Sequence, residues 1–380
     1  MKILINALSA RQGGGQTYLM NLLQFMPDDF DAEIFILAPD GLDLPLRANV
    51  KRIKVDWPVA NPYSRAIWER FLLPSLLKKY QINLLFCPGG VIGTSLPKGC
   101  LGVTMFRNMI PFDMKQRLRY PLGPARLRNW LLNRVMLRSM IQADLVIFIS
   151  EWARHVIENL AEQPIKSVVI HHGINPLFRS PQKVADTRPE WLPEGDYLLY
   201  VSTLDVYKAQ LELIRGYALA HQDTGLKHKL ILIGPENHVY GQQVRDEILR
   251  LGLTEHVILM GTVKYSELPL VYRHAAVNLF ASECENCPNI LLEALASGQP
   301  VLCSSIPPMP EFGGDAVEYF DPTSPRDFAD KITTLLADQS RLNTLAAKAL
   351  ERSNLYDWNA TARKTWNALF QAWHERQQQT

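Results

Sequence analysis

The first half of the chain alternates short apolar runs with segments of helical periodicity. Apolar residues that recur every three or four positions indicate an amphipathic helix, and short apolar runs bounded by turn residues indicate buried strands. The strands expected here are Ile3–Asn6, Glu33–Leu37, Asn83–Cys87, Leu145–Ile149 and Val168–His171. The expected helices are Gln16–Phe25, Tyr63–Tyr80, Pro124–Ile141 and a helix that Ser150 caps and Glu151 begins. Strands that alternate with helices predict a parallel sheet.

The pattern stops over residues 173–196, which are rich in Pro and polar residues, so we expect a linker there. It then restarts. The strands expected in the second half are Tyr197–Ser202, Lys229–Gly234, Val257–Met260, Val277–Phe280 and Pro300–Cys303. The helices expected between them include Ala209–His221 and Gln242–Leu251.

Two such series predict two Rossmann-like α/β domains, residues 1–180 and 181–359, facing each other across a cleft. Ligands of such sheets bind beyond the carboxyl ends of the strands. A final amphipathic helix, residues 360–380, either completes the core of the second domain or crosses back to the first.

Composition changes this picture little. The 380 residues are 47% hydrophobic and 21% charged, which is ordinary for a globular protein. The apolar run at the N-terminus is too short for a signal peptide, and no apolar stretch is long enough to cross a bilayer. We therefore expect a cytoplasmic protein, or one bound to the cytoplasmic face of the inner membrane. Five cysteines do not indicate a disulfide scaffold, and Cys284 and Cys287 are best interpreted as reduced loop residues.

Charge is distributed unevenly behind the net charge of +2. Residues 1–180 hold 22 Lys+Arg against 13 Asp+Glu, and residues 181–380 hold 18 against 25. Within residues 114–142 there is no acid, and the basic residues are Lys115, Arg117, Arg119, Arg126, Arg128, Arg134 and Arg138. A basic helix interleaved with Trp and Leu can lie on an anionic membrane, or it can pack on the sheet with its basic face in water. No nucleic-acid-binding motif accompanies the charge.

The most informative segment, residues 282–301, follows a predicted strand and supplies a turn, a helix and the next strand. Glu285 lies in the turn, Asn289 is the expected N-cap, and Glu293 lies just inside the helix. Unpaired N–H groups at a helix start can hold a diphosphate, and one carboxylate on each side can accept ribose or sugar hydroxyls. On spacing alone, the better interpretation is that Glu293 is a first-turn acid favoured by the helix dipole and Glu285 a solvated loop residue, because two glutamates eight apart are common.

The sequence from Glu293 to Val301 resolves that choice, because Glu285 and Glu293 with this tail resemble the Glu-x7-Glu signature of retaining glycosyltransferase family 4, the group 1 glycosyl transferases. Residues 286–288 are Asn-Cys-Pro where the family commonly has Gly-Phe-Gly. The resemblance implies the GT-B fold, a nucleotide-sugar donor and no metal or other cofactor. It implies that Glu285 orients the sugar and that Glu293 binds the ribose.

Other landmarks of that family follow in order. Lys208 fits its phosphate-binding lysine, whereas Thr203 stands where the family has an arginine. The remaining residues to which the resemblance assigns a donor contact are Gly261, Val263, Asn289, Ile290 and Leu291. Those expected to line the acceptor side are Gly13, Gly14, Gly15, Arg107 and Asn108.

The predicted activity is transfer of a sugar to a saccharide or a lipid-linked glycan in surface polysaccharide synthesis, such as lipopolysaccharide. Two alternatives stay open: a nucleotide-sugar epimerase or phosphorylase, and a non-catalytic subunit that binds nucleotide or carbohydrate. A nicotinamide oxidoreductase is disfavoured, because residues 13–15 do not form a complete dinucleotide fingerprint.

Overall fold

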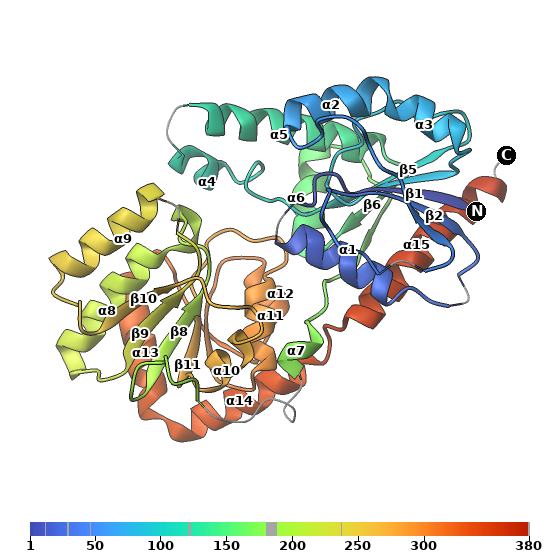
Figure 1. Cartoon of the computed structure of the whole chain (residues 1–380). Coiled ribbons are helices and arrows are strands. Elements are labelled where there is room, and N and C mark those ends of the chain that lie inside the picture. Colours follow the sequence, from blue (N-terminus) through green and yellow to red (C-terminus); the bar gives the residue numbers. More distant parts are fainter. Residues whose placement is uncertain are drawn as a thin grey trace. The chain divides into compact units, whose positions relative to one another are not determined.

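The computed structural model describes residues 1–11, 13–28, 30–45, 47–120, 123–179, 188–236 and 238–378. The chain divides into two compact units (Figure 1). Unit 1 comprises Met1–Gly173 and Asp357–Thr380, and unit 2 comprises Ile174–Tyr356.

Unit 1 is built on a parallel sheet of seven strands in its described part, in the order β3-β2-β1-β4-β5-β6-β7. The strands are β1 (Lys2–Asn6), β2 (Glu33–Leu37), β3 (Val50–Arg52), β4 (Leu84–Cys87), β5 (Leu101–Phe106), β6 (Leu145–Phe148) and β7 (Ser167–Val169). Helices cover both faces of such a sheet, so its central strands are largely apolar. Ile3, Leu4 and Ile5 of β1, for example, are 0% exposed.

The helices of unit 1 include the predicted ones, with one correction. They are α1 (Gly14–Gln24), α2 (Pro62–Phe71), α3 (Leu73–Lys79), α4 (Met114–Arg119), α5 (Pro124–Gln142), α6 (Glu151–Ala161) and α15 (Trp358–Gln378). Of these, α4 was not predicted. The single helix predicted at Tyr63–Tyr80 is two helices. Pro74 is the reason, because it has no N–H to continue a helix and is favoured in a first turn, here that of α3.

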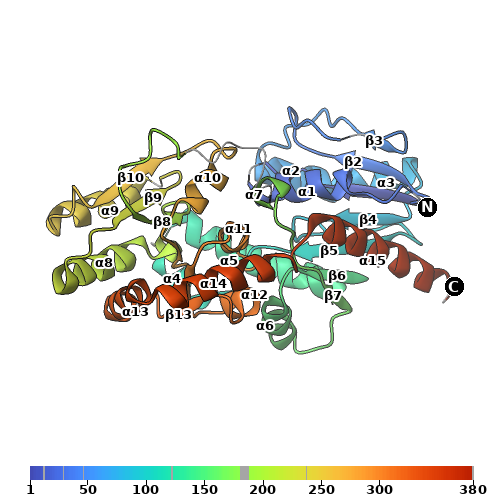
Figure 2. The ribbon, with the colours of Figure 1, turned by 90° about the horizontal axis from the view of Figure 1, so that it is seen from below.

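The C-terminal helix α15 belongs to unit 1 and packs against α1 (Figure 2). The Trp366 indole N–H donates to the Leu22 carbonyl over 3.0 Å, and the hydroxyls of Tyr18 and Thr365 lie 3.4 Å apart. Of the two alternatives for this helix, the crossing back to the first domain is therefore the one found.

Residues 174–179, predicted as the end of the first domain, pack with unit 2 instead. They form the short helix α7 (Pro176–Arg179) where a linker was expected. The Ile174 N–H donates to the Tyr356 carbonyl over 3.0 Å, and Arg179 donates to the Ser353 carbonyl over 2.6 Å. These bonds tie the start of unit 2 to its end. The rest of the predicted linker lies partly in residues 180–187, outside the described residues.

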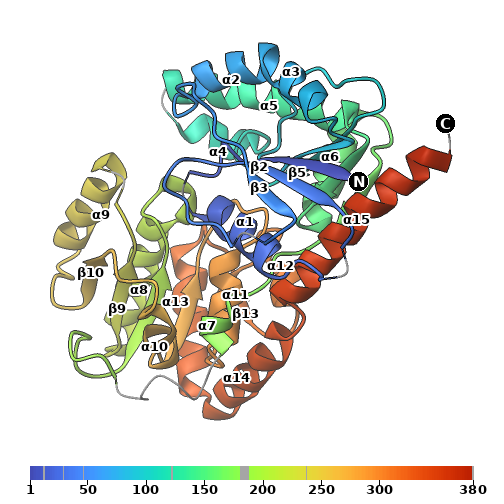
Figure 3. The same cartoon turned by 45° about the vertical axis from the view of Figure 1, so that its right-hand side comes forward.

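Unit 2 has a six-stranded parallel sheet in its described part, in the order β10-β9-β8-β11-β12-β13. The strands are β8 (Tyr197–Val201), β9 (Lys229–Ile233), β10 (Val257–Gly261), β11 (Val277–Phe280), β12 (Val301–Ser304) and β13 (Glu318–Phe320). The helices are α8 (Gln210–Thr224), α9 (His238–Arg250), α10 (Leu268–Arg273), α11 (Asn289–Ala296), α12 (Met309–Gly313), α13 (Pro325–Ala337) and α14 (Gln339–Ser353). Helix α8 packs against α13, and α11 against α14 (Figure 3).

Both sheets have the doubly wound order, in which the chain starts at a central strand, moves to one edge and returns to the other side. The predicted α/β class with two Rossmann-like domains is confirmed. The direction reverses beside β1 and β4 in unit 1 and beside β8 and β11 in unit 2. Loops diverge at such a switch point, which is where doubly wound sheets bind ligands.

Among the described residues, every helix falls short of the length and apolar character that a bilayer-spanning segment needs.

Candidate functional site

The switch point of unit 2 holds a buried ion pair. Lys208 ends the short 3-10 helix Val206–Lys208 that follows β8, and Glu285 lies in the loop that follows the neighbouring strand β11. Lys208 Nζ donates to Glu285 Oε1, and the two side chains are only 7% and 15% exposed. A single charge buried in this way would be destabilising. Here each charge compensates the other away from water.

Neighbouring aromatic residues and backbone bonds fix this pair in place. The Tyr200 hydroxyl donates to the Lys208 carbonyl over 3.0 Å, and Lys208 Nζ lies 5.0 Å from the centre of the Tyr207 ring. The Glu283 N–H donates to the Tyr207 carbonyl over 2.7 Å, which ties the loop after β11 to the loop after β8. The cation is therefore preorganised at the carboxyl ends of both central strands.

Helix α11 begins directly after that loop, and its start corrects one prediction. Asn289 is the first helical residue and not the N-cap, because Pro288 occupies the cap position and offers no side-chain hydrogen bond. A helix cannot pair the N–H groups of its own first turn. Those of Ile290 and Leu291 lie in this turn, so they are suited to hold an anion with the help of the helix dipole.

Glu293 lies one turn into α11 and is bound by a tyrosine from another loop. Tyr265 lies in the loop between β10 and α10, and its hydroxyl donates to Glu293 Oε1 over 2.8 Å. Burial raises the pKa of Glu293 to about 7, although the bond from Tyr265 lowers it. From the sequence, Tyr265 belongs only to the stretch from Gly261 that resembles the family's nucleotide-base lining. Its contact with Glu293 was not predicted, because the two residues stand 28 positions apart.

The other predicted donor-side residues lie at the ends of the same sheet. Thr203 is exposed beyond β8, and its carbonyl accepts a hydrogen bond from the Gln210 amide over 3.0 Å. Gly261 ends β10 with a φ of 66°, and its carbonyl accepts from the Gly234 N–H over 2.8 Å. Val263 packs partly buried against the core of unit 2. Thr203 thus brings a hydroxyl and no cation to this edge.

The switch point of unit 1 is made from backbone and one arginine. Gly13 precedes α1 with a φ of 59°, and Gly14 begins the helix. A side chain on Gly15 would meet the Ala10 backbone at 3.2 Å and Arg107 at 3.7 Å, so Arg107 lies against this loop. The Arg107 guanidinium also lies 5.5 Å from the centre of the Tyr18 ring. Asn108 follows in the same loop and is exposed.

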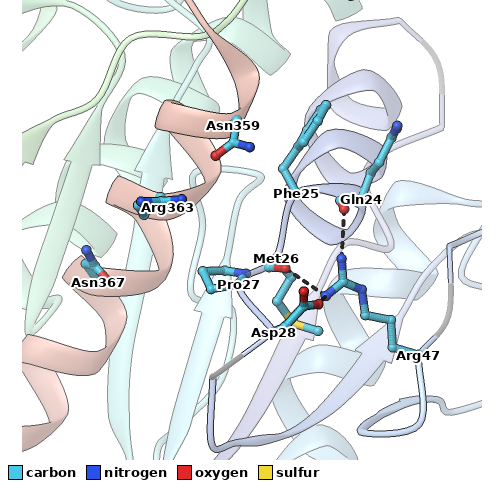
Figure 4. A pocket seen from close by; sticks show the side chains of 9 residues that line it. All are labelled: Gln24, Phe25, Met26, Pro27, Asp28, Arg47, Asn359, Arg363 and Asn367. Carbon is cyan, nitrogen blue, oxygen red and sulfur yellow. Dashed lines mark hydrogen bonds and ion pairs between the residues drawn. The ribbon is translucent and has the colours of Figure 1, made fainter.

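Away from its switch point, unit 1 has a cleft of about 630 Å³ between the end of α1 and the start of α15 (Figure 4). Arg363 and two asparagines of α15 line one wall, and Arg47 lines the other. Arg47 Nη1 donates to the Met26 carbonyl over 2.7 Å, and Nη2 to the Gln24 carbonyl over 3.0 Å. These carbonyls end α1, so Arg47 has a structural role there as a helix cap. None of the predicted site residues lines this cleft.

The described part of the chain contains no group of three or more His, Cys, Asp or Glu residues that could hold a metal ion.

Models of two protein families match the chain, one in each half. The model described as "Glycosyltransferase Family 4" matches residues 12–177, and the model described as "Glycosyl transferases group 1" matches residues 185–352. The two matches span nearly all of both units.

Among curated proteins, the chain is 27% identical over 235 residues to the O-antigen chain mannosyltransferase B of Escherichia coli. The matched stretch covers 60% of this chain and 61% of that protein. Among solved structures, sucrose-phosphate synthase from Thermosynechococcus elongatus matches with a TM-score of 0.79 at 18% identity, over 98% of both chains. Anabaena HepE in complex with UDP-glucose matches with a TM-score of 0.73 at 18% identity, over 98% of this chain and 100% of that one.

Proposed function

Because the chain belongs to the group 1 glycosyltransferases and has their GT-B fold, we propose that it is a retaining glycosyltransferase. It moves a sugar from a nucleoside-diphosphate sugar to a hydroxyl group of its acceptor. The observation that carries this proposal is the buried pair Lys208–Glu285 at the switch point of unit 2, followed directly by the start of α11.

In the proposed reaction, the bond between the anomeric carbon and the diphosphate oxygen breaks, and the acceptor oxygen bonds to the same face of that carbon. The electron pair leaves with the diphosphate, and the acceptor's proton passes to an oxygen of this leaving group. Lys208 and the N–H groups of Ile290 and Leu291 stabilise the charge that develops there, which is a preorganised electrostatic role. Glu285 accepts hydroxyls of the transferred sugar, and Glu293 accepts those of the ribose.

For the acceptor we propose a saccharide or a lipid-linked glycan in surface polysaccharide synthesis. The relative from Escherichia coli that acts on the O-antigen chain supports this class. Gly13, Gly15 and Arg107 are the acceptor-side residues of unit 1, because glycines let an acceptor approach the backbone closely.

The test is a thermal-shift panel of UDP-, GDP-, ADP- and dTDP-sugars, followed by transfer assays with the donor that stabilises most. NMR of the product should show the donor's anomeric configuration. Glu285→Gln keeps the shape of the side chain and should reduce transfer by roughly 10²-fold or more while nucleotide binding persists. Undiminished transfer by Glu285→Gln would contradict the site. Epimerisation without acceptor, or nucleotide binding without any turnover, would favour the alternative activities.

We also propose that residues 114–142 contact an anionic membrane, at the cytoplasmic face of the inner membrane. Helices α4 and α5 expose large apolar side chains beside their basic ones, among them Leu127 at 58%, Trp130 at 40% and Leu131 at 45%. The Arg134 guanidinium lies 4.1 Å from the centre of the Trp130 ring. A hollow of about 420 Å³ between Arg117, Arg126 and Trp130 fits a lipid phosphate. Exposed apolar side chains beside basic ones are what such a contact would use.

Flotation with vesicles of phosphatidylglycerol and phosphatidylcholine tests this contact. The protein should float with the anionic mixture and remain in solution with phosphatidylcholine alone, because the basic side chains need anionic headgroups. Leu127→Ser/Leu131→Ser should abolish flotation. Leu249→Ser, at a 64% exposed position of unit 2, is the matched control and should float like the wild type. Wild-type protein that stays in solution with both mixtures would contradict the proposal.

A further inference from the structure

The ribose-side carboxylate, Glu293, is held by a residue that the reaction scheme above does not use. Tyr265 is 45% exposed and comes from the loop after β10, yet its hydroxyl donates to Glu293 Oε1 over 2.8 Å. The pKa of Tyr265 is raised well above the usual value of a tyrosine, mainly by burial and to a smaller extent by the charge of Glu293. The phenol therefore always keeps its proton and always donates to the carboxylate.

The Tyr265 ring is supported by the segment that begins unit 2. It packs edge-on against the buried ring of Phe178 in α7, with 5.4 Å between the ring centres. Asn175 makes a side-chain hydrogen bond that lowers the pKa of Tyr265, and its Oδ1 accepts from the Leu177 N–H over 3.0 Å. Asn175, Tyr265 and Glu293 thus form a chain of hydrogen bonds that a loop residue in open solvent would not have.

One more titratable group faces Glu293. Tyr272 of α10 is 1% exposed, interacts electrostatically with Glu293, and packs against the same Phe178 ring at 5.8 Å. Burial raises the pKa of this phenol too, so it stays neutral. Of these groups, only the carboxyl of Glu293 changes its charge near neutral pH.

We propose that Tyr265 is a positioning residue for donor binding: its hydroxyl, supported by Asn175 and Phe178, holds Glu293 Oε1 so that Oε2 remains available to the vicinal hydroxyls of the donor's ribose. The inference rests on the proposed function, since it takes Glu293 as the ribose-binding group. It adds a residue from a loop that neither glutamate motif contains.

The pKa of Glu293, about 7, predicts how nucleotide affinity depends on pH. Below this value the carboxyl is protonated and accepts fewer hydrogen bonds from a ribose, so affinity should fall as the pH drops through about 7. Removing the Tyr265 hydroxyl raises the pKa of Glu293 further, because that bond lowers it. The fall should then begin at a higher pH.

The experiment titrates UDP, GDP, ADP and dTDP calorimetrically into wild type, Tyr265→Phe, Glu293→Gln and Tyr217→Phe between pH 6 and 8.5. Tyr265→Phe keeps the ring on Phe178 and should bind the preferred nucleotide about five- to tenfold more weakly at pH 7, as expected for the loss of one ordinary hydrogen bond. In Tyr265→Phe, the midpoint of the fall in nucleotide affinity should lie at higher pH than in the wild type. Glu293→Gln should lose the part of the pH dependence of affinity that belongs to the carboxyl. In turnover, the donor KM should rise and kcat should change little, because the ribose is bound alike in ground and transition states.

Tyr217→Phe is the matched control. Tyr217 lies in α8 of the same unit and is buried, and the substitution removes its 2.7 Å hydrogen bond to the His228 carbonyl. It should leave affinity and midpoint as in the wild type. If Tyr265→Phe binds nucleotide with the wild-type affinity and midpoint, the inference is overturned while the proposed function stands. If the wild-type protein binds none of the four nucleotides, both are overturned.

Discussion

The two sheets share one strand order but differ in what they offer at the switch point. In unit 2, the loops after β8 and β11 bring two opposite charges together away from water and hold them with aromatic rings and backbone bonds. In unit 1, the loop after β1 offers glycine backbone, and Arg107 lies beside it. The switch point of unit 2 is preorganised by buried side chains. At that of unit 1, glycines without side chains leave space beside the backbone.

This difference matches two kinds of ligand. A diphosphate carries the same charge in every nucleotide sugar, so a fixed cation and fixed helix N–H groups suit it. Acceptors vary in shape, and a loop without side chains places few demands on them. The comparison predicts that changes in unit 2 act on stability, donor binding and chemistry together, whereas changes in the loop of unit 1 act on the acceptor.

The largest effect is expected from Lys208→Met. It removes the cation and leaves Glu285 as an uncompensated charge that is 15% exposed, so the free energy of unfolding should fall by about 3–5 kcal/mol. Transfer should fall by roughly 10²–10³-fold. The double variant Lys208→Met/Glu285→Gln removes both charges and should recover most of the stability but none of the transfer.

Urea unfolding and single-turnover assays on the two single variants and the double variant separate these effects. Recovery of stability without recovery of activity would establish that the pair is coupled in the free protein and needed in the reaction. A double variant no more stable than Lys208→Met would contradict the view that unit 2 is preorganised by its buried side chains, because the ion pair would then contribute nothing to stability before the donor binds.

The apolar strands of both sheets could be predicted from sequence because they are buried on both faces and appear as continuous apolar runs. Three strands could not. β3 is only Val50–Arg52 at a sheet edge, β13 is only Glu318–Phe320 at the other sheet's edge, and β5 contains Gly102 and Thr104 within its six residues. Short or polar strands give no clear period, and their neighbours in the sheet decide their conformation.

The candidate site divides in the same way. Glu285 and Lys208 were predicted through the family resemblance, and they lie together because each follows a central strand of one parallel sheet. The contact between Tyr265 and Glu293 was not predicted because the two residues are distant in sequence, and the support from Asn175 and Phe178 comes from a segment interpreted as linker. Contacts between segments this far apart leave no periodic pattern in the sequence.

The smallest expected effect belongs to the glycine loop of unit 1. Gly13 has a φ of 59° with no heavy atom within 4 Å of an added Cβ, so Gly13→Ala strains the backbone by about 1–3 kcal/mol without a clash. Gly41 has a φ of 78° and the same open surroundings, which makes Gly41→Ala a control for backbone strain within the same unit. Both variants should lose some thermal stability.

Only Gly13→Ala should raise the acceptor KM, by a few-fold, because the strain shifts the backbone where the acceptor approaches. Neither variant should change nucleotide affinity in calorimetry, since the residues proposed to bind the donor all lie in unit 2. A Gly13→Ala protein with weaker nucleotide binding and an unchanged acceptor KM would reverse the assignment of the two switch points. The loop of unit 1 would then bind phosphate through its backbone N–H groups, and the comparison would become one between two phosphate sites.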